Sequence, residues 1–195
     1  MVKLAVFASG SGSNFEAIAS EIEKGALDAK IALVVCDRPG AKVEERAERF
    51  GIPVLSFYPK SYNSKAEFEA FILQQLNDAG VELIVLAGYM RLIGSTLLRA
   101  YEGRIINIHP SLLPSFPGKD AIGQALKAKV KVSGVTVHYV DEGMDTGPII
   151  DQETIRISTE DSREEVEKKI QAVEHQLYPA VIRTLLKNKT IGSRR

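Results

Sequence analysis

The sequence predicts an α/β protein with a doubly wound, mostly parallel sheet and helices on both faces. The first observation is that apolar runs alternate with amphipathic segments through residues 3–103. The second is that these runs are apolar at nearly every position, which is typical of strands buried on both faces. Such strands, separated by helices, form right-handed βαβ units, so the sheet is expected to be covered on both sides.

Four strand–helix units make up the predicted N-terminal half. Their ranges are 3–8 with 14–25, 30–37 with 41–51, 52–57 with 64–80, and 81–88 with 95–103. A fifth buried run, residues 104–109, follows them. It leads into residues 110–118, here called the proline loop because they include Pro110, Pro114 and Pro117.

The C-terminal part departs from this alternation. A helix is predicted over residues 120–130, and two strands over 133–141 and 147–158, joined by DEGMDTG, here called the acidic loop. Their alternating polar and apolar positions favour an exposed, antiparallel extension of the sheet. A capping box and helical spacing of apolar residues predict a long closing helix over 161–188. We expect one domain, residues 1–190, and a loose tail, residues 191–195.

The composition favours a protein that acts on small molecules. Lys plus Arg and Asp plus Glu are both 25, so there is no excess positive charge to drive non-specific nucleic-acid binding. A single cysteine excludes an internal disulfide framework, and no Cys/His zinc cluster of usual spacing is present. No segment approaches the roughly 18 apolar residues of a membrane span. We therefore expect a cytoplasmic protein without metal, membrane or nucleic-acid partners.

A glycine-rich turn, residues 10–14, follows the first predicted strand. Gly10 and Gly12 allow a tight turn, and Ser13 and Asn14 stand at the start of the next helix. Backbone N–H groups and hydroxyls at a helix N-terminus bind anions, most naturally a phosphate. The alternative is that Ser13 or Asn14 only caps the helix.

A dinucleotide-binding turn is the main rival for this segment. Asp37 ends the second predicted strand about where a ribose-binding acid would lie. Phe15, however, replaces the third glycine of the G-x-G-x-x-G pattern, and the G-x-x-x-x-G-K-[ST] phosphate loop is absent. A monophosphate therefore fits better than a dinucleotide or a triphosphate.

The fifth predicted strand ends in NIHPSLLP. Asn107 and His109 are two positions apart, so their side chains point to the same face. Pro110 and Pro114 restrict the loop that follows. An amide N–H and an imidazole directed at one point suit a carbonyl oxygen that becomes an oxyanion. A lone histidine at a strand end is more often structural, so this interpretation requires a partner.

The candidate partners are the acids of the acidic loop. These are Asp141, Glu142 and Asp145, and sequence spacing does not show which of them meets His109. A carboxylate beside His109 would orient the imidazole and favour its protonated form. His138, in the preceding strand, fits a core position and a functional position equally well.

Direct transfer between two bound molecules is the chemistry that these residues allow. The sequence has no G-x-S-x-G elbow, no second cysteine and no metal cluster to supply a nucleophile or a Lewis acid. If acyl chemistry occurs here, the attacking group must arrive with a substrate.

Together these segments resemble the folate-dependent formyltransferases. The resemblance covers nearly the whole chain and rests on FASGSGSN, LAGYMRL, NIHPSLLPSFPG, VTVHYVDEGMDTGPII and EHQLYP. The SGSGSN turn and the chain length select the branch that acts in purine biosynthesis. The resemblance implies transfer of the formyl group of 10-formyltetrahydrofolate, a co-substrate, to the amine of glycinamide ribonucleotide, without a metal.

The resemblance also implies roles for three groups of residues. The catalytic group is Asn107, His109 and Asp145. The ribonucleotide group, which holds the phosphate and ribose, is Gly12, Ser13, Asn14, Lys65 and Glu174. The folate group is Met90, Arg91, Leu92, Ile93, Val140, Asp141 and Glu142.

Three positions refine these assignments. Lys65 stands where some relatives have an arginine near the phosphate, which keeps the charge but changes the hydrogen-bond donors. Glu174, in EHQLYP, matches the residue that holds the ribose hydroxyls. After the proline loop the chain reads KDAI where certain relatives have histidines, so we assign that segment no catalytic or pH-sensitive role.

Three alternatives stay open at this point. A nucleotide-cofactor dehydrogenase would share the strand–turn–helix start, and a non-catalytic folate or nucleotide-binding module would have no use for the Asn-x-His pair. Formylation of methionyl-transfer RNA is the nearest enzymatic alternative, disfavoured by the balanced charge and the chain length. The sequence leaves both a monomer and a homodimer open.

Overall fold

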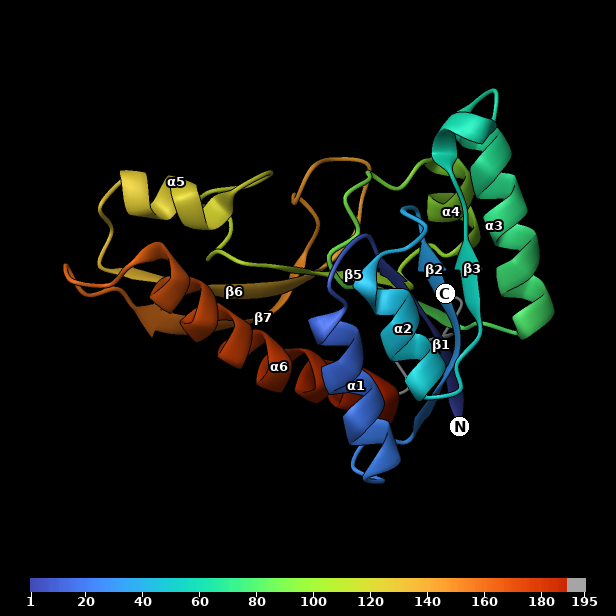
Figure 1. Ribbon diagram of the computed structural model, residues 1–195, viewed down its shortest axis with the longest axis horizontal. Helices are drawn as coiled ribbons and strands as arrows, with labels where there is room; N and C mark the ends of the chain where they lie inside the picture. The colour runs from blue at the N-terminus through green and yellow to red at the C-terminus, as the bar shows by residue number, and fades with distance from the viewer. Residues whose placement is uncertain (189–195) are drawn as a thin grey trace.

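A seven-stranded sheet organises the residues that the computed structural model describes, 1–188 (Figure 1). The strands are β1 (Val2–Ala8), β2 (Ala29–Cys36), β3 (Val54–Ser56), β4 (Leu83–Leu86), β5 (Ile105–His109), β6 (Val132–Tyr139) and β7 (Ile149–Arg156). Their order is β3-β2-β1-β4-β5-β6-β7. Pairing is parallel from β3 to β5 and antiparallel from β5 to β7, which confirms the mixed sheet predicted from the sequence.

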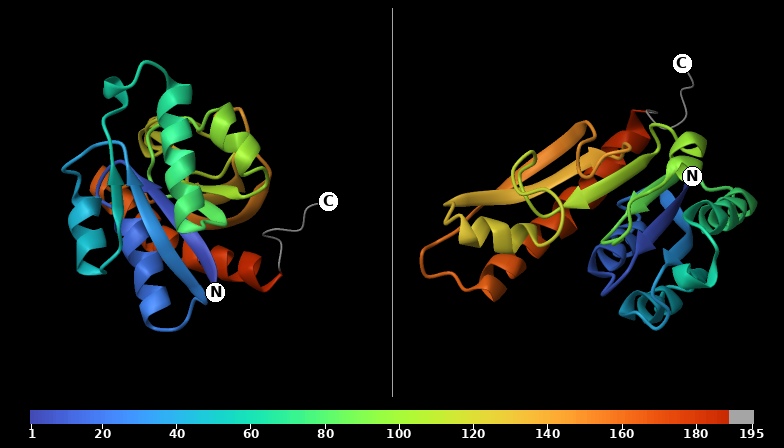
Figure 2. Two further views of the ribbon diagram at one scale, coloured as in Figure 1. Left: turned by 90° about the vertical axis from the view of Figure 1, so that its right-hand side faces the viewer. Right: turned by 90° about the horizontal axis from the view of Figure 1, so that it is seen from above.

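Helices cover both faces of this sheet, as predicted. They are α1 (Ser13–Glu23), α2 (Lys42–Arg49), α3 (Lys65–Ala79), α4 (Ser95–Ala100), α5 (Ala121–Lys127) and α6 (Arg163–Lys187), with a 3-10 turn η1 (Pro59–Ser61). The first face carries α1, α2 and α6, and the second carries α3 and α4. Helix α5 lies beside α6 near β6 and β7, at the end of the sheet away from β3 (Figure 2).

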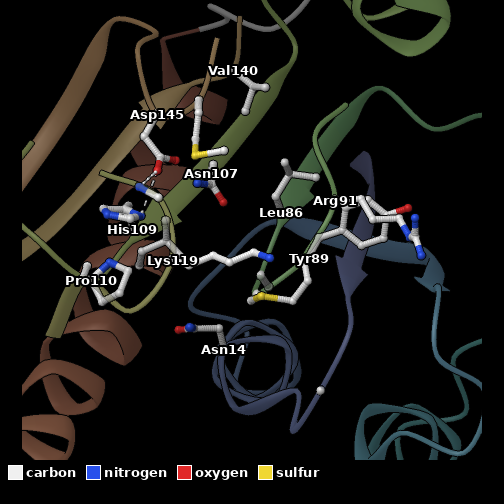
Figure 3. Close-up of a pocket in the computed structure, with 18 of the residues that line it drawn as sticks. Asn14, Leu86, Tyr89, Arg91, Asn107, His109, Pro110, Lys119, Val140 and Asp145 are labelled. Carbon is white, nitrogen blue, oxygen red and sulfur yellow. Dashed lines mark hydrogen bonds and ion pairs between the residues drawn. The ribbon is translucent and has the colours of Figure 1, made fainter. Parts of the chain in front are cut away.

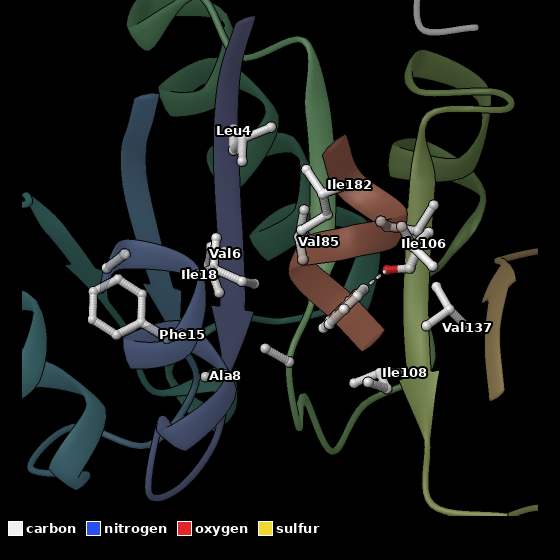
Figure 4. Packing of buried hydrophobic residues seen from close by; sticks show 14 of the residues in the cluster. Leu4, Val6, Ala8, Phe15, Ile18, Val85, Ile106, Ile108, Val137 and Ile182 are labelled. Atoms are coloured by element: carbon white, nitrogen blue, oxygen red, sulfur yellow. Dashed lines mark hydrogen bonds between the residues drawn. The ribbon is translucent and has the colours of Figure 1, made fainter. Parts of the chain in front are cut away.

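Successive residues of β1 face the two helical layers in turn. Leu4 and Val6 pack with Ile18 of α1 (Figure 4), whereas Ala5 and Phe7 pack with residues of α3 and α4. All four β1 residues are fully buried. A central strand covered on both sides must be apolar at every position, which explains the continuous apolar run in the sequence.

Helix α6 is anchored at both its start and its middle. Ser162 and Glu165 form the predicted capping box at its N-terminus. The buried hydroxyl of Tyr178 lies 2.8 Å from the carbonyl oxygen of Leu86 in β4 and 3.2 Å from that of Ile106 in β5. This contact ties α6 to two adjacent strands, and it places Glu174, one helical turn earlier, beside the sheet.

Some strands are shorter than the sequence predicted. Strand β3 covers only Val54–Ser56 of the predicted 52–57, because it pairs with β2 alone and is preceded by Pro53, which has no N–H to donate. Strand β4 covers only Leu83–Leu86 of the predicted 81–88. The antiparallel extension is only partly as exposed as expected. Most residues of β7, the edge strand, face solvent. Strand β6 is buried from Ser133 to His138, because it lies between β5 and β7 and contacts α6.

Two further expectations concern the membrane and the C-terminus. Among residues 1–188, no helix is both long and apolar enough to span a bilayer. The tail predicted at residues 191–195 lies outside the described residues.

Candidate active site

One cavity of about 800 Å³ lies at the carboxyl ends of the parallel strands (Figure 3). Its wall is formed by the glycine-rich turn after β1, residues 86–93 after β4, the end of β5, the end of the proline loop with the start of α5, the acidic loop, and Glu174 of α6. Ligand sites in open α/β sheets gather at this edge because loops and helix N-termini meet there. The volume falls within the range of about 300–1,000 Å³ typical of small-molecule sites.

Asn107 and His109 reach this cavity from the same face of β5, as predicted. The intervening Ile108 and the preceding Ile106 point the opposite way, into the core beneath α6. The strand therefore divides its side chains between a polar cavity and an apolar core, as the two-residue period of a strand requires.

Asp145 is the acid that meets His109. Its Oδ2 lies 3.4 Å from Nδ1 of His109 and accepts a 2.7 Å hydrogen bond from the backbone N–H of Gly118 in the proline loop. The Asp145 side chain is only 13% exposed. In Figure 3 the carboxylate and the imidazole point toward one another across the cavity wall. The pair joins β5, the proline loop and the acidic loop at one point.

The other two acids of the acidic loop have different surroundings. Asp141 accepts hydrogen bonds from the backbone N–H of Gly143 at 3.0 Å and from the hydroxyl of Thr146 at 2.7 Å, so it shapes the loop. Glu142 is exposed and does not line the cavity. Asp145 itself adopts a left-handed backbone conformation, with φ of 57°, which directs its side chain inward. Aspartate tolerates this conformation better than most residues do.

The second ring nitrogen of His109 is also engaged. Nε2 lies 2.9 Å from the carbonyl oxygen of Phe116 in the proline loop. A carbonyl oxygen only accepts hydrogen bonds, so Nε2 carries a proton and donates it. The proton that could serve an oxyanion is thus bonded to the proline loop in this structure.

His138, which the sequence left undecided between core and function, is brought into this group. It is 2% exposed and sits directly opposite Asn107 in the antiparallel pairing of β5 and β6. Its Nε2 lies 3.2 Å from Nδ2 of Asn107 and 3.7 Å from Oδ1 of Asp145. Burial is the main cause that lowers the pKa of His138 below its usual 6.5.

The glycine-rich turn opens α1 without a side-chain cap. Gly12 is the N-cap residue, with φ of 72°, and no side chain accepts a hydrogen bond from the first turn of α1. The alternative in which Ser13 or Asn14 caps the helix is therefore wrong. Gly10 to Asn14 line the cavity, so the free N–H groups of the helix start are available to an anion.

Close packing explains why this turn needs glycine at position 12. A Cβ atom on Gly12 would lie 2.6 Å from Cγ2 of Val43 in α2. The backbone N–H of Val43 also donates to the carbonyl oxygen of Gly10 at 3.1 Å. Helix α2 thus braces the turn from behind and leaves its other side open to the cavity.

Glu174 lies beside the turn. It accepts a 3.1 Å hydrogen bond at Oε2 from Nδ2 of Asn14. Burial raises the pKa of Glu174 above its usual 4.5, and the hydrogen bond from Asn14 offsets part of that shift. The carboxylate is thus held at the edge of the cavity, where it could accept hydrogen bonds from hydroxyl groups.

The structure does not bring Lys65 to the glycine-rich turn. Lys65 is the exposed first residue of α3, its Cε atom lies close to Gly94, and it does not line the cavity. Its role at the phosphate stays a prediction without support from this geometry. Four other cations, Arg38, Arg91, Lys119 and Arg163, line the cavity instead.

The segment after β4 forms a separate, more apolar wall. It contributes Met90, Arg91, Leu92 and Ile93, and Val140 and Asp141 face it from the start of the acidic loop. Met90 is 58% exposed and Leu92 is 50% exposed. Exposed apolar side chains at a cavity mouth suit a flat, partly apolar ligand.

Asp37 supports this wall from below. Its carboxylate accepts hydrogen bonds from Nε of Arg91 at 2.7 Å and from the hydroxyl of Ser9, which in turn accepts from the backbone N–H of Met90. Asp37 is 4% exposed. Its oxygens are occupied within the protein, so it does not present the free carboxylate that a dinucleotide ribose would need.

Comparisons with known proteins identify the family. The sequence model described as formyl transferase matches residues 2–182. This chain belongs to the formyl transferase family. It is 63% identical over 186 residues to phosphoribosylglycinamide formyltransferase of Bacillus subtilis (strain 168), a match that covers 95% of each protein.

Other relatives of this formyl transferase agree. It is 41% identical to the trifunctional purine biosynthetic protein adenosine-3 of Gallus gallus, over 93% of this chain and 18% of that protein. A crystal structure of glycinamide ribonucleotide transformylase 1 from Geobacillus kaustophilus superposes with a TM-score of 0.93 at 61% identity, covering 95% of this chain and 99% of that chain.

Sequence reasoning missed several residues that shape the site of this formyl transferase. The hydroxyl of Thr136 in β6 donates to the carbonyl oxygen of Ser111 at 2.7 Å and accepts from the N–H of Leu113 at 3.0 Å. Gln152 of β7 donates to the carbonyl oxygen of Leu113 at 2.9 Å. These contacts hold the proline loop against the sheet. The one available signal was the alternation of polar residues in VTVHYV, which places Thr136 on the same face as His138.

Proposed function

We propose that this formyl transferase transfers the formyl group of 10-formyltetrahydrofolate to the amine of glycinamide ribonucleotide, giving N-formylglycinamide ribonucleotide and tetrahydrofolate in de novo purine biosynthesis. The observation that carries the proposal is that three groups of residues with different chemistry line one cavity. The Asn107–His109–Asp145 group lines the same cavity as two other surfaces, an anion-binding turn and a largely apolar wall. A reaction between two bound molecules needs this arrangement.

The ribonucleotide would occupy the side formed by α1 and α6. Its phosphate would accept hydrogen bonds from the backbone N–H groups of the glycine-rich turn and from Ser13. Glu174 would accept hydrogen bonds from the ribose hydroxyls while it stays bonded to Asn14. Lys119, whose side chain extends into the cavity, adds a positive charge there (Figure 3).

The formylfolate would occupy the other side. Its ring would rest on the exposed side chains of Met90 and Leu92, and the backbone of Val140 and Asp141, at the start of the acidic loop, would contact it. Arg91 is held by Asp37, so this wall is largely formed before the ligand binds. Preformed walls reduce the ordering cost of binding.

The chemistry would proceed by direct attack of the substrate amine on the formyl carbon. The carbonyl oxygen then becomes an oxyanion, which Asn107 and His109 stabilise by donating hydrogen bonds. Asp145 would stabilise the positive charge on the His109 ring through Nδ1. As the C–N bond to the folate breaks, the amine loses a proton and the folate nitrogen gains one, so no external acid or base is consumed.

The proline loop would lose its hydrogen bond from His109 during this step. Nε2 of His109 donates to the carbonyl oxygen of Phe116 in this structure. The developing oxyanion is a stronger acceptor than an amide carbonyl and would compete for that proton.

The reducing cytoplasm is the proposed compartment, in keeping with the free, buried thiol of Cys36.

One assay tests the proposal. The protein is mixed with 10-formyltetrahydrofolate and glycinamide ribonucleotide, and tetrahydrofolate formation is followed by absorbance. We expect turnover with the ribonucleotide and none with methionyl-transfer RNA as acceptor. A titration with NAD(P)H should leave its fluorescence unchanged. Formylation of the transfer RNA alone, or binding of both ligands without product, would contradict the proposal.

A further inference from the structure

The hydrogen bonds of His138 define its tautomer. Nδ1 lies 2.8 Å from the carbonyl oxygen of Tyr139, and a carbonyl oxygen only accepts. Nδ1 therefore carries a proton. In a neutral ring Nε2 then has a lone pair and must face a donor, and the atom 3.2 Å away is Nδ2 of Asn107.

The same contacts decide which way the amide of Asn107 is turned. An asparagine amide has two N–H donors on one end and a carbonyl oxygen on the other. With the nitrogen toward Nε2 of His138, one N–H is donated to the histidine and the second remains free. With the amide reversed, its oxygen would face a lone pair, which is repulsive. Neutral His138 is compatible with one orientation only.

We propose that neutral His138 is a positioning residue that holds the amide of Asn107 with a free N–H available to the oxyanion of formyl transfer. This inference rests on the proposed function for the role of Asn107. His138 does not touch the reacting atoms itself. Its contribution is orientational, since an amide free to turn would present its oxygen to the oxyanion part of the time.

The cross-strand register makes this contact rigid. Asn107 and His138 are direct partners in the antiparallel ladder of β5 and β6. Directly opposed residues on one face of such a pair are close neighbours, so neither side chain needs a loop to reach the other. His138 is nearly fully buried, so water does not replace the contact.

Protonation of His138 would reverse the arrangement. A proton on Nε2 turns that atom into a donor, which would be satisfied by Oδ1 of Asn107 after reversal of the amide or by Oδ1 of Asp145, 3.7 Å away. Either outcome breaks the bond from Nδ2 of Asn107. The charged side chains around His138 are Asp145 and Asp141 of the acidic loop and His109 of β5.

These neighbours act in opposite directions on the pKa of His138. Burial lowers it most, the carbonyl of Tyr139 and the carboxylate of Asp145 raise it, and His109 lowers it again, while Asp141 raises it slightly. The net effect is a pKa below the usual 6.5, which keeps the ring neutral at pH 7. Acidification should therefore break the hydrogen bond that holds the free N–H of Asn107 toward the site.

The first test reads the tautomer directly in the wild-type protein. Nitrogen-15 NMR of the imidazole rings distinguishes a protonated ring nitrogen from one with a lone pair, and the chain has only three histidines to assign. The spectrum of His138→Gln assigns His138 by difference. We expect Nδ1 protonated and Nε2 unprotonated at pH 7 to 8. An Nε2–H tautomer or an imidazolium would overturn the proposal, whether or not the protein is active.

The second test uses two substitutions at position 138. His138→Met removes the acceptor, and we expect kcat to fall by about 10-fold or more, toward the roughly 10²- to 10³-fold cost of losing one oxyanion donor. The KM for the folate should change little. His138→Gln keeps an acceptor, because its amide N–H can bond Asp145 and leave its oxygen for Asn107. We expect its kcat to stay within about 3-fold of wild type, a loss under about 1 kcal/mol.

The pH profile separates positioning from packing. In the wild type kcat should fall as His138 takes up a proton, and in His138→Gln the fall should begin at a lower pH. His175→Gln in α6 is the matched control, because His175 makes no contact with Asn107, and its profile should follow the wild type. Identical acid limbs for the wild type and His138→Gln would overturn the pH dependence.

A double-mutant cycle completes the design. In an Asn107→Ala background, His138→Met should cause no further fall in kcat, because the residue acts only through the amide. A further fall of the same size would overturn the proposal. If wild type itself forms no product, the proposed function fails, whereas active wild type with an equally active His138→Met refutes only the role of His138.

Discussion

Asp145 and His109 form a contact that no single segment of the chain could provide. Oδ2 of Asp145 lies 3.4 Å from Nδ1 of His109, and the same oxygen accepts the backbone N–H of Gly118 at 2.7 Å. The imidazole is thereby fixed between the acidic loop and the proline loop, with Nε2 bonded to the carbonyl of Phe116. A ring held at both nitrogens has little freedom to turn, which suits a group that must donate to one point.

Replacement of Asp145 tests the value of this charge. In Asp145→Asn the carboxamide keeps the shape but loses the negative charge opposite Nδ1 of His109. We expect kcat to fall by at least about 10²-fold, the lower range for an acid–base group. Folate binding, followed by fluorescence, should change little. The matched control is Asp151→Asn on β7, an exposed position whose activity should equal wild type. Equal activity of the two variants would rule out the assigned role.

Removal of the imidazole should separate turnover from binding. His109→Ala deletes the proposed donor to the oxyanion, so kcat should fall by about 10²- to 10³-fold. The proposed folate side of the cavity is formed by other residues, so the folate dissociation constant should stay close to wild type. Steady-state kinetics and a folate titration on the same preparation check both parts. Near-normal turnover would refute the proposed catalytic role of His109.

The glycine-rich turn should affect one substrate and not the other. Replacing both Ser13 and Asn14 by alanine removes polar groups from the proposed phosphate site and releases Glu174 from its bond with Asn14. We expect the KM for the ribonucleotide to rise far more than the KM for the folate. The folate value serves as the internal control, and equal effects on both would contradict a phosphate role.

The buried carboxylate of Glu174 should lower the stability of the protein while it strengthens binding of the ribonucleotide. Its pKa is raised by burial, so the folded protein binds the proton more tightly than the unfolded chain does. The resulting contribution to the free energy of unfolding is fully present below the unfolded pKa of about 4.5 and is lost as pH rises through the folded pKa. Glu174→Gln cannot ionise, so it does not lose this stability. The difference between its Tm and that of the wild type should therefore grow in favour of the variant as the pH rises from 5 to 8.

The same variant should bind the ribonucleotide less well. A neutral amide accepts weaker hydrogen bonds from ribose hydroxyls than a carboxylate does, so we expect the ribonucleotide KM to rise by about 10-fold or more. Thermal scans at several pH values and steady-state kinetics provide the two readouts. A Tm difference that does not change with pH would argue against burial as the cause.

Two glycines of the glycine-rich turn, Gly10 and Gly12, offer a matched pair for a stability test. Gly12 has φ of 72°, and a Cβ there would lie 2.6 Å from Cγ2 of Val43, so Gly12→Ala should cost about 2 kcal/mol or more. At Gly10 no atom lies within 4 Å of an added Cβ, and φ is not positive. Gly10→Ala should therefore cost less than about 1 kcal/mol. Urea unfolding of both variants measures the difference, and similar losses would refute the packing argument.

Local patterns predicted much of the architecture. The continuous apolar run of β1 indicates a strand covered on both faces, and the pair Ser162 and Glu165 marks the start of α6. The spacing of Asn107 and His109 already places them on one face of β5. These features depend on neighbours within a few residues, so a single sequence contains the information.

Long-range geometry decided the remaining features. Lys65 was expected near the phosphate, yet it opens α3 away from the cavity, while Lys119 reaches the cavity from beyond the proline loop. Such placements depend on how loops from distant parts of the chain pack together. Sequence spacing does not measure those distances.

The sequence by itself determined the parallel core, the glycine-rich turn, and an Asn and a His on one face at a strand end. Only the tertiary structure decided that Asp145 meets His109 and that His138 faces Asn107. The first follows from the left-handed backbone of Asp145 in the acidic loop, and the second from the register between β5 and β6. Both are contacts between segments far apart in the chain, so the periodicity of neither segment could reveal them.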